Sequence, residues 1–126
     1  MRFLVVDDSA IMRRILVNSL QRIGFTDCVE AEDGLQALEK FGPSISFVIT
    51  DWNMPVMSGI DFARTLRSYA SGRTVPILMV TTRSSREDIV TAVEAGVNSY
   101  IVKPFTPQLL KQKIDHVLST IVAPAT

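Results

Sequence analysis

The sequence has few of the residue types from which many metal and redox sites are built. It contains one cysteine, Cys28, and one histidine, His116. With a single cysteine, no internal disulfide can form. A lone cysteine at the start of an apolar run fits a packed thiol in a reducing compartment, so we expect a cytoplasmic protein. His116 lies in a helical pattern without a ligand partner at metal-binding spacing, and we interpret it as a surface residue.

An excess of one charge and long hydrophobic runs are also missing. Thirteen basic and thirteen acidic residues cancel, so no overall field attracts the protein to nucleic acid or to an anionic membrane. No apolar run approaches the roughly 18 residues of a membrane span. The apolar start at 3–6 meets Asp7 too early for a signal peptide. We therefore expect no nucleic-acid partner and no membrane insertion.

The hydrophobic residues, 47% of the chain, alternate between short apolar runs and longer segments of helical period. The short runs predict five strands, at 3–6, 28–31, 45–49, 76–80 and 99–102. A helical pattern follows each strand and begins at a residue suited to capping. The predicted caps are Ser9, Asp33 with Gln36, Ser58 with Asp61, Ser84 with Glu87, and Thr106 before Pro107.

The strands have continuous apolar runs instead of alternating polar and apolar residues, which is typical of strands covered by helices on both faces. Right-handed crossovers between such strands give a doubly wound α/β fold. We therefore predict a three-layer sandwich with a five-stranded parallel sheet and five helices. The chain should form a single domain over 1–122, followed by a disordered tail at 123–126 and no output domain.

Polar residues follow four of the predicted strands. Asp7 and Asp8 follow the first strand, Asp51 the third, Thr81 the fourth and Lys103 the fifth. Because the carboxyl ends of parallel strands meet at one edge of a sheet, these side chains should lie close together. Two carboxylates about 4 Å apart repel by roughly 4 kcal/mol at an effective dielectric constant of 20. Mg²⁺ prefers such oxygen ligands and would relieve the repulsion, and Asp51 is then placed as a nucleophile for a phosphoryl group.

Each of these residues also has a simpler explanation when it is considered alone. Asp51 can belong to an ordinary strand-to-helix turn, and Asp7 and Asp8 can be favourable charges at a helix N-terminus. Thr81 can be an ordinary β-branched strand residue, and Lys103 can be a solvated surface cation. Only their combination on matching strand ends favours a functional site.

In that combination, the sequence resembles the receiver domain of two-component response regulators over essentially its full length, and most of all the stand-alone chemotaxis members of that family. The resemblance is carried by Asp7-Asp8, by Asp51-Trp52-Asn53-Met54-Pro55, by Val80-Thr81 and by 99–105. It implies a flavodoxin-like fold with strand order 2-1-3-4-5 and a cis peptide between Lys103 and Pro104.

The resemblance also implies roles for particular residues. Asp51 would be the phosphoacceptor, and Asp7, Asp8 and Asp51 would hold Mg²⁺ with the carbonyl group of Asn53. Lys103 and Thr81 would contact the phosphoryl oxygens. Thr81 and Tyr100 would form the switch, and Asn53 and Arg83 would tune the lifetime of the phosphate. The implied partner surface consists of Arg86, Ile89, Val93, Tyr100, Val102 and Lys113.

The fourth predicted helix has more apolar residues than one buried face requires. The surplus is either a partner surface or a wide core face. By the resemblance, a sensor histidine kinase or a phosphotransfer protein acts upstream, and a protein such as a flagellar motor switch protein is the target. A phosphatase is a possible further partner. We expect a monomer that catalyses only its own phosphoryl transfer and slow dephosphorylation.

Three alternatives remain at this stage. The chain could be a receiver fragment, or a phosphorelay or scaffold receiver, of a larger signalling protein. A magnesium-dependent phosphohydrolase of the haloacid dehalogenase type would have a second acid where Asn53 stands. A flavodoxin-like cofactor carrier would need a loop rich in hydroxyl groups and glycine after the first strand, where the sequence has Asp7-Asp8-Ser9.

Overall fold

Five strand-helix units follow one another along the chain in the computed structural model, which describes residues 1–121. All neighbouring strands pair in parallel, in the order β2-β1-β3-β4-β5. This confirms the predicted fold class and strand order. The predicted end of the domain at 122 and the predicted tail at 123–126 lie outside the described residues. The elements are β1 Arg2–Val6, α1 Ala10–Arg22, β2 Asp27–Ala31, α2 Gly34–Lys40, β3 Phe47–Thr50, α3 Gly59–Ser68, the 3₁₀ turn η1 Ala70–Gly72, β4 Ile77–Thr81, α4 Arg86–Glu94, β5 Ser99–Val102 and α5 Pro107–Ile121.

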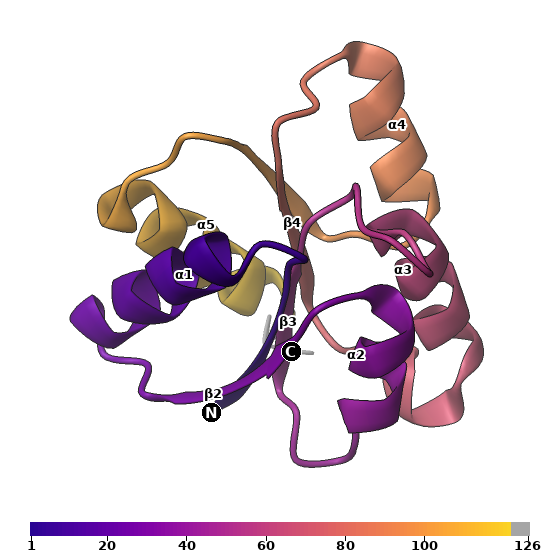
Figure 1. The fold of residues 1–126 in the computed structure, drawn as a ribbon, viewed down its shortest axis with the longest axis horizontal. Helices are drawn as coiled ribbons and strands as arrows, with labels where there is room; N and C mark the ends of the chain where they lie inside the picture. Colours follow the sequence, from indigo (N-terminus) through magenta and orange to yellow (C-terminus); the bar gives the residue numbers. More distant parts are fainter. Residues whose placement is uncertain (122–126) are drawn as a thin grey trace.

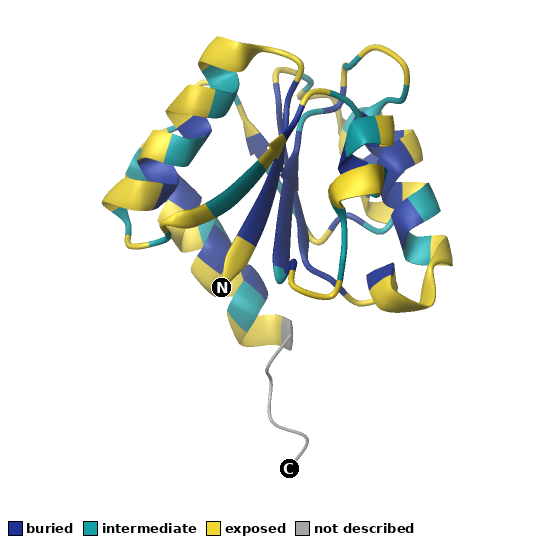
Figure 2. Ribbon diagram, turned by 60° about the horizontal axis from the view of Figure 1, so that its bottom comes forward, coloured by how far each residue is buried: buried dark blue, intermediate teal, exposed yellow. Residues whose placement is uncertain are grey.

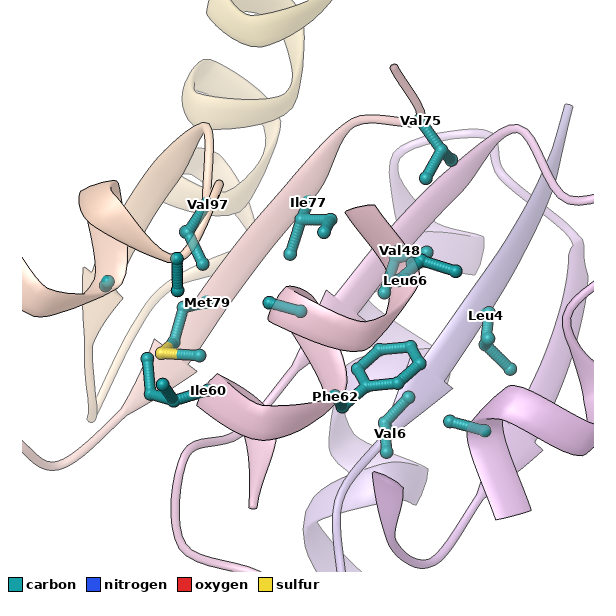
Figure 3. Packing of buried hydrophobic residues seen from close by; sticks show 14 of the residues in the cluster. Leu4, Val6, Val48, Ile60, Phe62, Leu66, Val75, Ile77, Met79 and Val97 are labelled. Carbon is teal, nitrogen blue, oxygen red and sulfur yellow. The ribbon is translucent and has the colours of Figure 1, made fainter. Parts of the chain in front are cut away.

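Helices cover both faces of the sheet and create two hydrophobic cores. Helices α1 and α5 lie on one face, and α2, α3 and α4 lie on the other (Figure 1). Successive residues of β1 alternate between the two cores: Phe3 packs with the α1 and α5 side, and Leu4 with the α3 side, where Phe62 and Leu66 lie (Figure 3). Every residue of β3 and β4 is buried, and the outward faces of the helices are exposed (Figure 2). Burial on both faces accounts for the continuous apolar runs.

Side-chain caps start the helices largely where the sequence predicted. Ser9, Asp33 and Ser58 each accept a hydrogen bond from the N–H group three residues later, and Thr106 Oγ1 accepts one from the N–H group of Leu109 at 3.1 Å. These contacts satisfy donors that have no partner within the helix. The positions of the first residues of α1, α2, α3 and α5 are thus explained by local chemistry.

The cap of α4 was predicted one residue too early. Ser85 is the N-cap, and its hydroxyl group accepts from the N–H group of Asp88 at 3.1 Å. Ser84-x-x-Glu87 and Ser85-x-x-Asp88 are overlapping motifs of the same kind, so local sequence alone does not separate them. With Ser85 as the cap, the carboxylate of Asp88 lies 3.3 Å from the guanidinium group of Arg83, just before the helix.

Helix α4 is the least buried of the helices on its face of the sheet. Within its bounds only Ala92 is buried, whereas α3 buries five residues. Ile89, Val90 and Val93 are 38%, 47% and 63% exposed, and the helix projects beyond α3 (Figure 1). The apolar surplus of this segment is therefore an exposed surface and not a wide core face.

Arg67 connects the C-terminal end of α4 to neighbouring elements. Its guanidinium group donates to the carbonyl oxygen of Gly96 at 3.1 and 2.8 Å, to those of Gly72 and Val75 at 2.9 and 2.6 Å, and to Asn98 Oδ1 at 3.0 Å. Burial lowers the pKa of Arg67. One side chain thus joins α3, the segment before β4, the end of α4 and the start of β5.

No helix within residues 1–121 combines the length and the apolar character that a membrane crossing requires.

Candidate functional site

Three carboxylates meet at the carboxyl edge of the sheet. Strands β1 and β3 are neighbours, with Val6 opposite Thr50, so the residues that follow them, Asp7 and Asp51, lie side by side. Asp7, Asp8 and Asp51 each offer a carboxylate oxygen, and these oxygens lie within 4.8 Å of one another. Asp7 is almost completely buried, whereas Asp8 is exposed.

Lys103 enters this cluster from the end of β5. Its Nζ lies 3.1 Å from Asp7 Oδ2 and 3.0 Å from Asp51 Oδ2, with 12% of its side chain exposed. Burial by itself lowers the pKa of Lys103, but hydrogen bonds and the negative charges of Asp51 and Asp7 outweigh that effect and raise it. The peptide between Lys103 and Pro104 is cis, as predicted. The lysine is therefore a permanently charged partner of two carboxylates.

Several effects act in opposite directions on the pKa of Asp7. Burial raises the pKa of its carboxyl group, the N–H group of Ser9 and the ammonium group of Lys103 lower it, and the charge of Asp51 raises it again. Burial dominates, so the folded protein holds the Asp7 carboxylate at a cost in free energy. A divalent cation would compensate for that cost, and the oxygen-only donor set is of the kind that Mg²⁺ takes. The residues present therefore fit a magnesium ion.

Asp51 is oriented by contacts on both carboxylate oxygens. Oδ1 accepts from the N–H group of Trp52 at 2.6 Å, and Oδ2 accepts from Lys103. Gly59 packs against the carbonyl oxygen of Asp51 so closely that no Cβ would fit there. The start of α3 therefore lies directly against the main chain of Asp51. These contacts hold the carboxylate in one position.

The loop after Asp51 contains a conformation that the sequence did not predict. Val56 has φ 70°, and the N–H group of Met57 donates to the carbonyl oxygen of Pro55 at 2.7 Å, which is a classic γ-turn. Gly34 N–H donates to the carbonyl oxygen of Met57 at 3.1 Å and ties the loop to α2. Valine is among the residues least suited to a positive φ, so its residue type gave no signal of this turn.

Thr81 and Tyr100 lie beside the cluster on the two neighbouring strands. Thr81 ends β4 and is completely buried, and its Oγ1 accepts from the N–H group of Arg83 at 3.4 Å. The hydroxyl group of Tyr100 donates to the carbonyl oxygen of Arg83 at 2.9 Å. Burial raises the pKa of Tyr100, and the charge of Asp88 adds to the effect. The main chain of Arg83 thus joins the two predicted switch residues.

The side chain of Arg83 bridges two parts of the site. Its Nε and Nη2 donate to Asn53 Oδ1 at 3.2 and 3.1 Å, and its Nη1 lies 3.3 Å from Asp88 Oδ1. The guanidinium carbon lies 4.5 Å from the centre of the Trp52 ring. The sequence predicted Asn53 and Arg83 as site residues but missed the roles of Trp52 and Asp88, because no sequence pattern shows where the Arg83 side chain lies after folding.

The residues predicted as a partner surface come from three consecutive elements. They retain at least partly exposed side chains, and β5 is the edge strand of the sheet. They are Arg86, Ile89 and Val93 on α4, Tyr100 and Val102 on β5, and Lys113 on α5.

The comparison with known proteins agrees with the arrangement of residues at this edge of the sheet. A family model described as the response regulator receiver domain matches residues 3–115. The chain belongs to the response regulator receiver domain family. Receiver domains are signalling switches and not classical enzymes, and the acidic cluster of this receiver domain is compatible with Mg²⁺.

The alignments with individual relatives cover nearly the whole chain. Chemotaxis protein CheY1 of Helicobacter pylori is 50% identical over 122 residues, which are 95% of this chain and 98% of the relative. Chemotaxis protein CheY of Pseudomonas aeruginosa is 46% identical, with 96% and 98% covered. The solved structure of chemotaxis response regulator CheY4 of Vibrio cholerae superposes with a TM-score of 0.83 at 34% identity, covering 92% and 97%.

Proposed function

We propose that this receiver domain is switched by transfer of a phosphoryl group to Asp51 in a reaction that requires Mg²⁺. The donor is a histidine kinase or a phosphotransfer protein that carries a phosphohistidine. The observation that supports this most directly is the place of the Asp51 carboxylate. It lies within 4.8 Å of the carboxylates of Asp7 and Asp8 and accepts from Lys103 at 3.0 Å.

The residues of this chain take separate roles in the proposed reaction. A carboxylate oxygen of Asp51 attacks phosphorus, and the phosphorus–nitrogen bond to the donor histidine breaks, with the electron pair leaving on the imidazole nitrogen. Asp7, Asp8, Asp51 and the carbonyl group of Asn53 would hold Mg²⁺. When bound, Mg²⁺ neutralises negative charge at the phosphoryl oxygens. Lys103 and Thr81 contact those oxygens.

Charge explains why both a cation and Lys103 are needed. Three carboxylates and one ammonium group leave two negative charges at the site, which one divalent ion cancels. The phosphoryl group then adds a charge of about −1.5 to −2. Arg83 and Asn53 lie at the rim of the site, where they tune access of water and of a phosphatase and thus the lifetime of the phosphate.

The proposed output is a change at the partner surface of α4, β5 and α5. Thr81 turns toward the phosphoryl group, Tyr100 rotates, and a target protein binds the altered surface. The similarity to chemotaxis proteins of H. pylori and P. aeruginosa favours a chemotaxis pathway with a flagellar motor switch protein as the target. Residues 1–122 act in this proposal as one monomeric cytoplasmic unit. Membership of a larger signalling protein, as a phosphorelay or scaffold receiver, is the alternative.

Mass spectrometry tests phosphorylation directly. The pure protein is incubated with acetyl phosphate and Mg²⁺, or with acetyl phosphate and EDTA, and the intact mass is recorded beside an Asp51→Asn variant. We expect a gain of one phosphoryl group that requires both Mg²⁺ and Asp51. A folded protein that gains no mass and releases no phosphate would contradict the proposal. Rapid, sustained release of phosphate would instead support a phosphohydrolase.

A further inference from the structure

Arg83 is shared between the loop after the phosphoacceptor and helix α4. On one side its guanidinium group donates twice to Asn53 Oδ1 and lies over the ring of Trp52. On the other side its Nη1 lies 3.3 Å from Asp88 Oδ1 in the first turn of α4. Trp52 and Asn53 directly follow Asp51, so one cation links the phosphoacceptor segment to the helix.

The two ends of α4 are held with different strength. At the C-terminal end, Gly96 accepts two hydrogen bonds from the half-buried guanidinium group of Arg67. At the N-terminal end, the side chains of Arg83 and Asp88 are 40% and 24% exposed, and water screens their attraction. Because α4 buries only Ala92 within its bounds, core packing does little to hold its first turns. The Arg83–Asp88 contact is therefore the easier end to release.

A phosphoryl group on Asp51 would compete for Arg83. It carries more negative charge than one carboxylate and presents three acceptor oxygens, and the planar guanidinium group matches phosphate oxygens well. Arg83 is already attached to the two residues that follow Asp51. Movement of its side chain toward the phosphoryl group would therefore cost the contact with Asp88.

We propose that Arg83 is a latch whose transfer from Asp88 to the phosphoryl group on Asp51 frees the first turns of α4. This inference rests on the proposed function and adds a second route from the site to the partner surface, beside Thr81 and Tyr100. With its C-terminal end fastened by Arg67, α4 pivots there and displaces Ile89 and Val93 relative to β5. Arg83 is a positioning residue in this device, since it acts on α4 through Asp88.

Hydrogen–deuterium exchange of the unphosphorylated protein tests the latch itself. We compare the α4 amides of the wild type with those of Arg83→Gln, Asp88→Asn and the double variant. Each single variant should raise exchange in the first turns several-fold. The double variant should raise it no further than the larger single effect, because both changes remove one contact. Glu87→Gln is the matched control: it removes another first-turn acid, and within residues 1–121 Arg83 forms its ion pair with Asp88 and not with Glu87.

Phosphorylation tests the transfer. With Mg²⁺ and acetyl phosphate, wild-type exchange in the first turns should rise to the level of unphosphorylated Asp88→Asn, and that variant should show no further rise. Intact mass of the same samples reports phosphorylation of Asp51. A phosphorylated wild type with unchanged exchange would overturn the latch and leave the proposed function standing. Additive single variants, or an equal effect of Glu87→Gln, would also overturn it. Absence of phosphoryl mass would overturn the proposed function together with the transfer step.

Discussion

Asp7 shows how a buried carboxylate opposes stability. It is 1% exposed and shares Lys103 with Asp51. Its pKa is raised above 3.8, mainly by burial. The folded state therefore binds the proton of Asp7 more tightly than the unfolded state does. The resulting stability is fully present below pH 3.8 and is lost as the pH rises through the folded-state pKa.

Replacing Asp7 by Asn should stabilise the metal-free protein at neutral pH. Asn keeps an oxygen to accept from the N–H group of Ser9 but does not titrate. Because removal of a poorly compensated buried charge is often stabilising, we expect a gain of about 1 kcal/mol in the free energy of unfolding at pH 7. Below pH 3.8 the difference should become smaller. Urea unfolding in EDTA at both pH values measures this.

Asp115→Asn is the control for this prediction, since Asp115 lies in an exposed pair with Lys111. It should change the free energy of unfolding by less than about 0.5 kcal/mol. Added Mg²⁺ should stabilise the wild type more than Asp7→Asn, because a ligand that binds only the folded state shifts the equilibrium. A clearly less stable Asp7→Asn protein at pH 7 in EDTA would show that the contact with Lys103 outweighs burial.

At the level of single residues, the sequence predicted the acidic cluster and Lys103 because each follows an apolar strand. It did not predict that Arg83 lies over Trp52 and contacts Asp88, because these contacts depend on where the loops lie after folding. The γ-turn at Val56 was missed for a different reason. The loop is held by Gly34 and Gly59 on either side, so tertiary contacts override the preference of valine.

Among the elements, α4 depends most on its cap because it buries little apolar surface. Ser85→Ala should lower the free energy of unfolding by about 1 kcal/mol, since the N–H group of Asp88 loses its partner. Ser84→Ala should change it by only a few tenths of a kcal/mol. Thermal unfolding of the two variants measures the difference. If Ser84→Ala were the more harmful change, the helix would begin where the sequence alone suggested.

Strands and helices were predictable because apolar runs and capping residues are signals that a few neighbouring residues contain. Strands β3 and β4, buried along their whole length, gave unbroken apolar runs. Boundaries were less certain: β3 begins at Phe47 and not at Ile45, whose N–H group instead donates to the carbonyl oxygen of Gly42 in a turn. The start of α4 could not be decided locally, because two serines offer the same motif.

For the whole molecule, Arg67 should be a principal stabilising residue. Arg67→Met removes donors from the carbonyl groups of Gly72, Val75 and Gly96. Leaving these partly buried acceptors without partners should lower the free energy of unfolding by about 3 kcal/mol. Urea unfolding measures this. The control is Arg64→Met, which removes an exposed cation from the same helix and should cost less than about 0.5 kcal/mol. Equal stability of the two variants would contradict the role of Arg67.

Some features of the overall architecture were predictable from the sequence and others were not. Alternating strands and helices indicated a doubly wound sheet, but the strand order came from the resemblance to receiver domains. The network around Arg67 was not predicted, because most of its acceptors are main-chain carbonyl groups up to 29 residues away. Such groups carry no side-chain identity, so no residue pattern marks them.

The position of Lys103 in the chain has a consequence for synthesis on the ribosome. Asp7 and Asp51 are brought together when β1 pairs with β3, but Lys103 is translated 52 residues after Asp51. A growing chain thus assembles the repelling carboxylates before it possesses the cation that separates them. The repulsion between these carboxylates is not compensated by Lys103 until β5 joins the sheet. Translation order therefore delays completion of the site until nearly the whole domain has emerged.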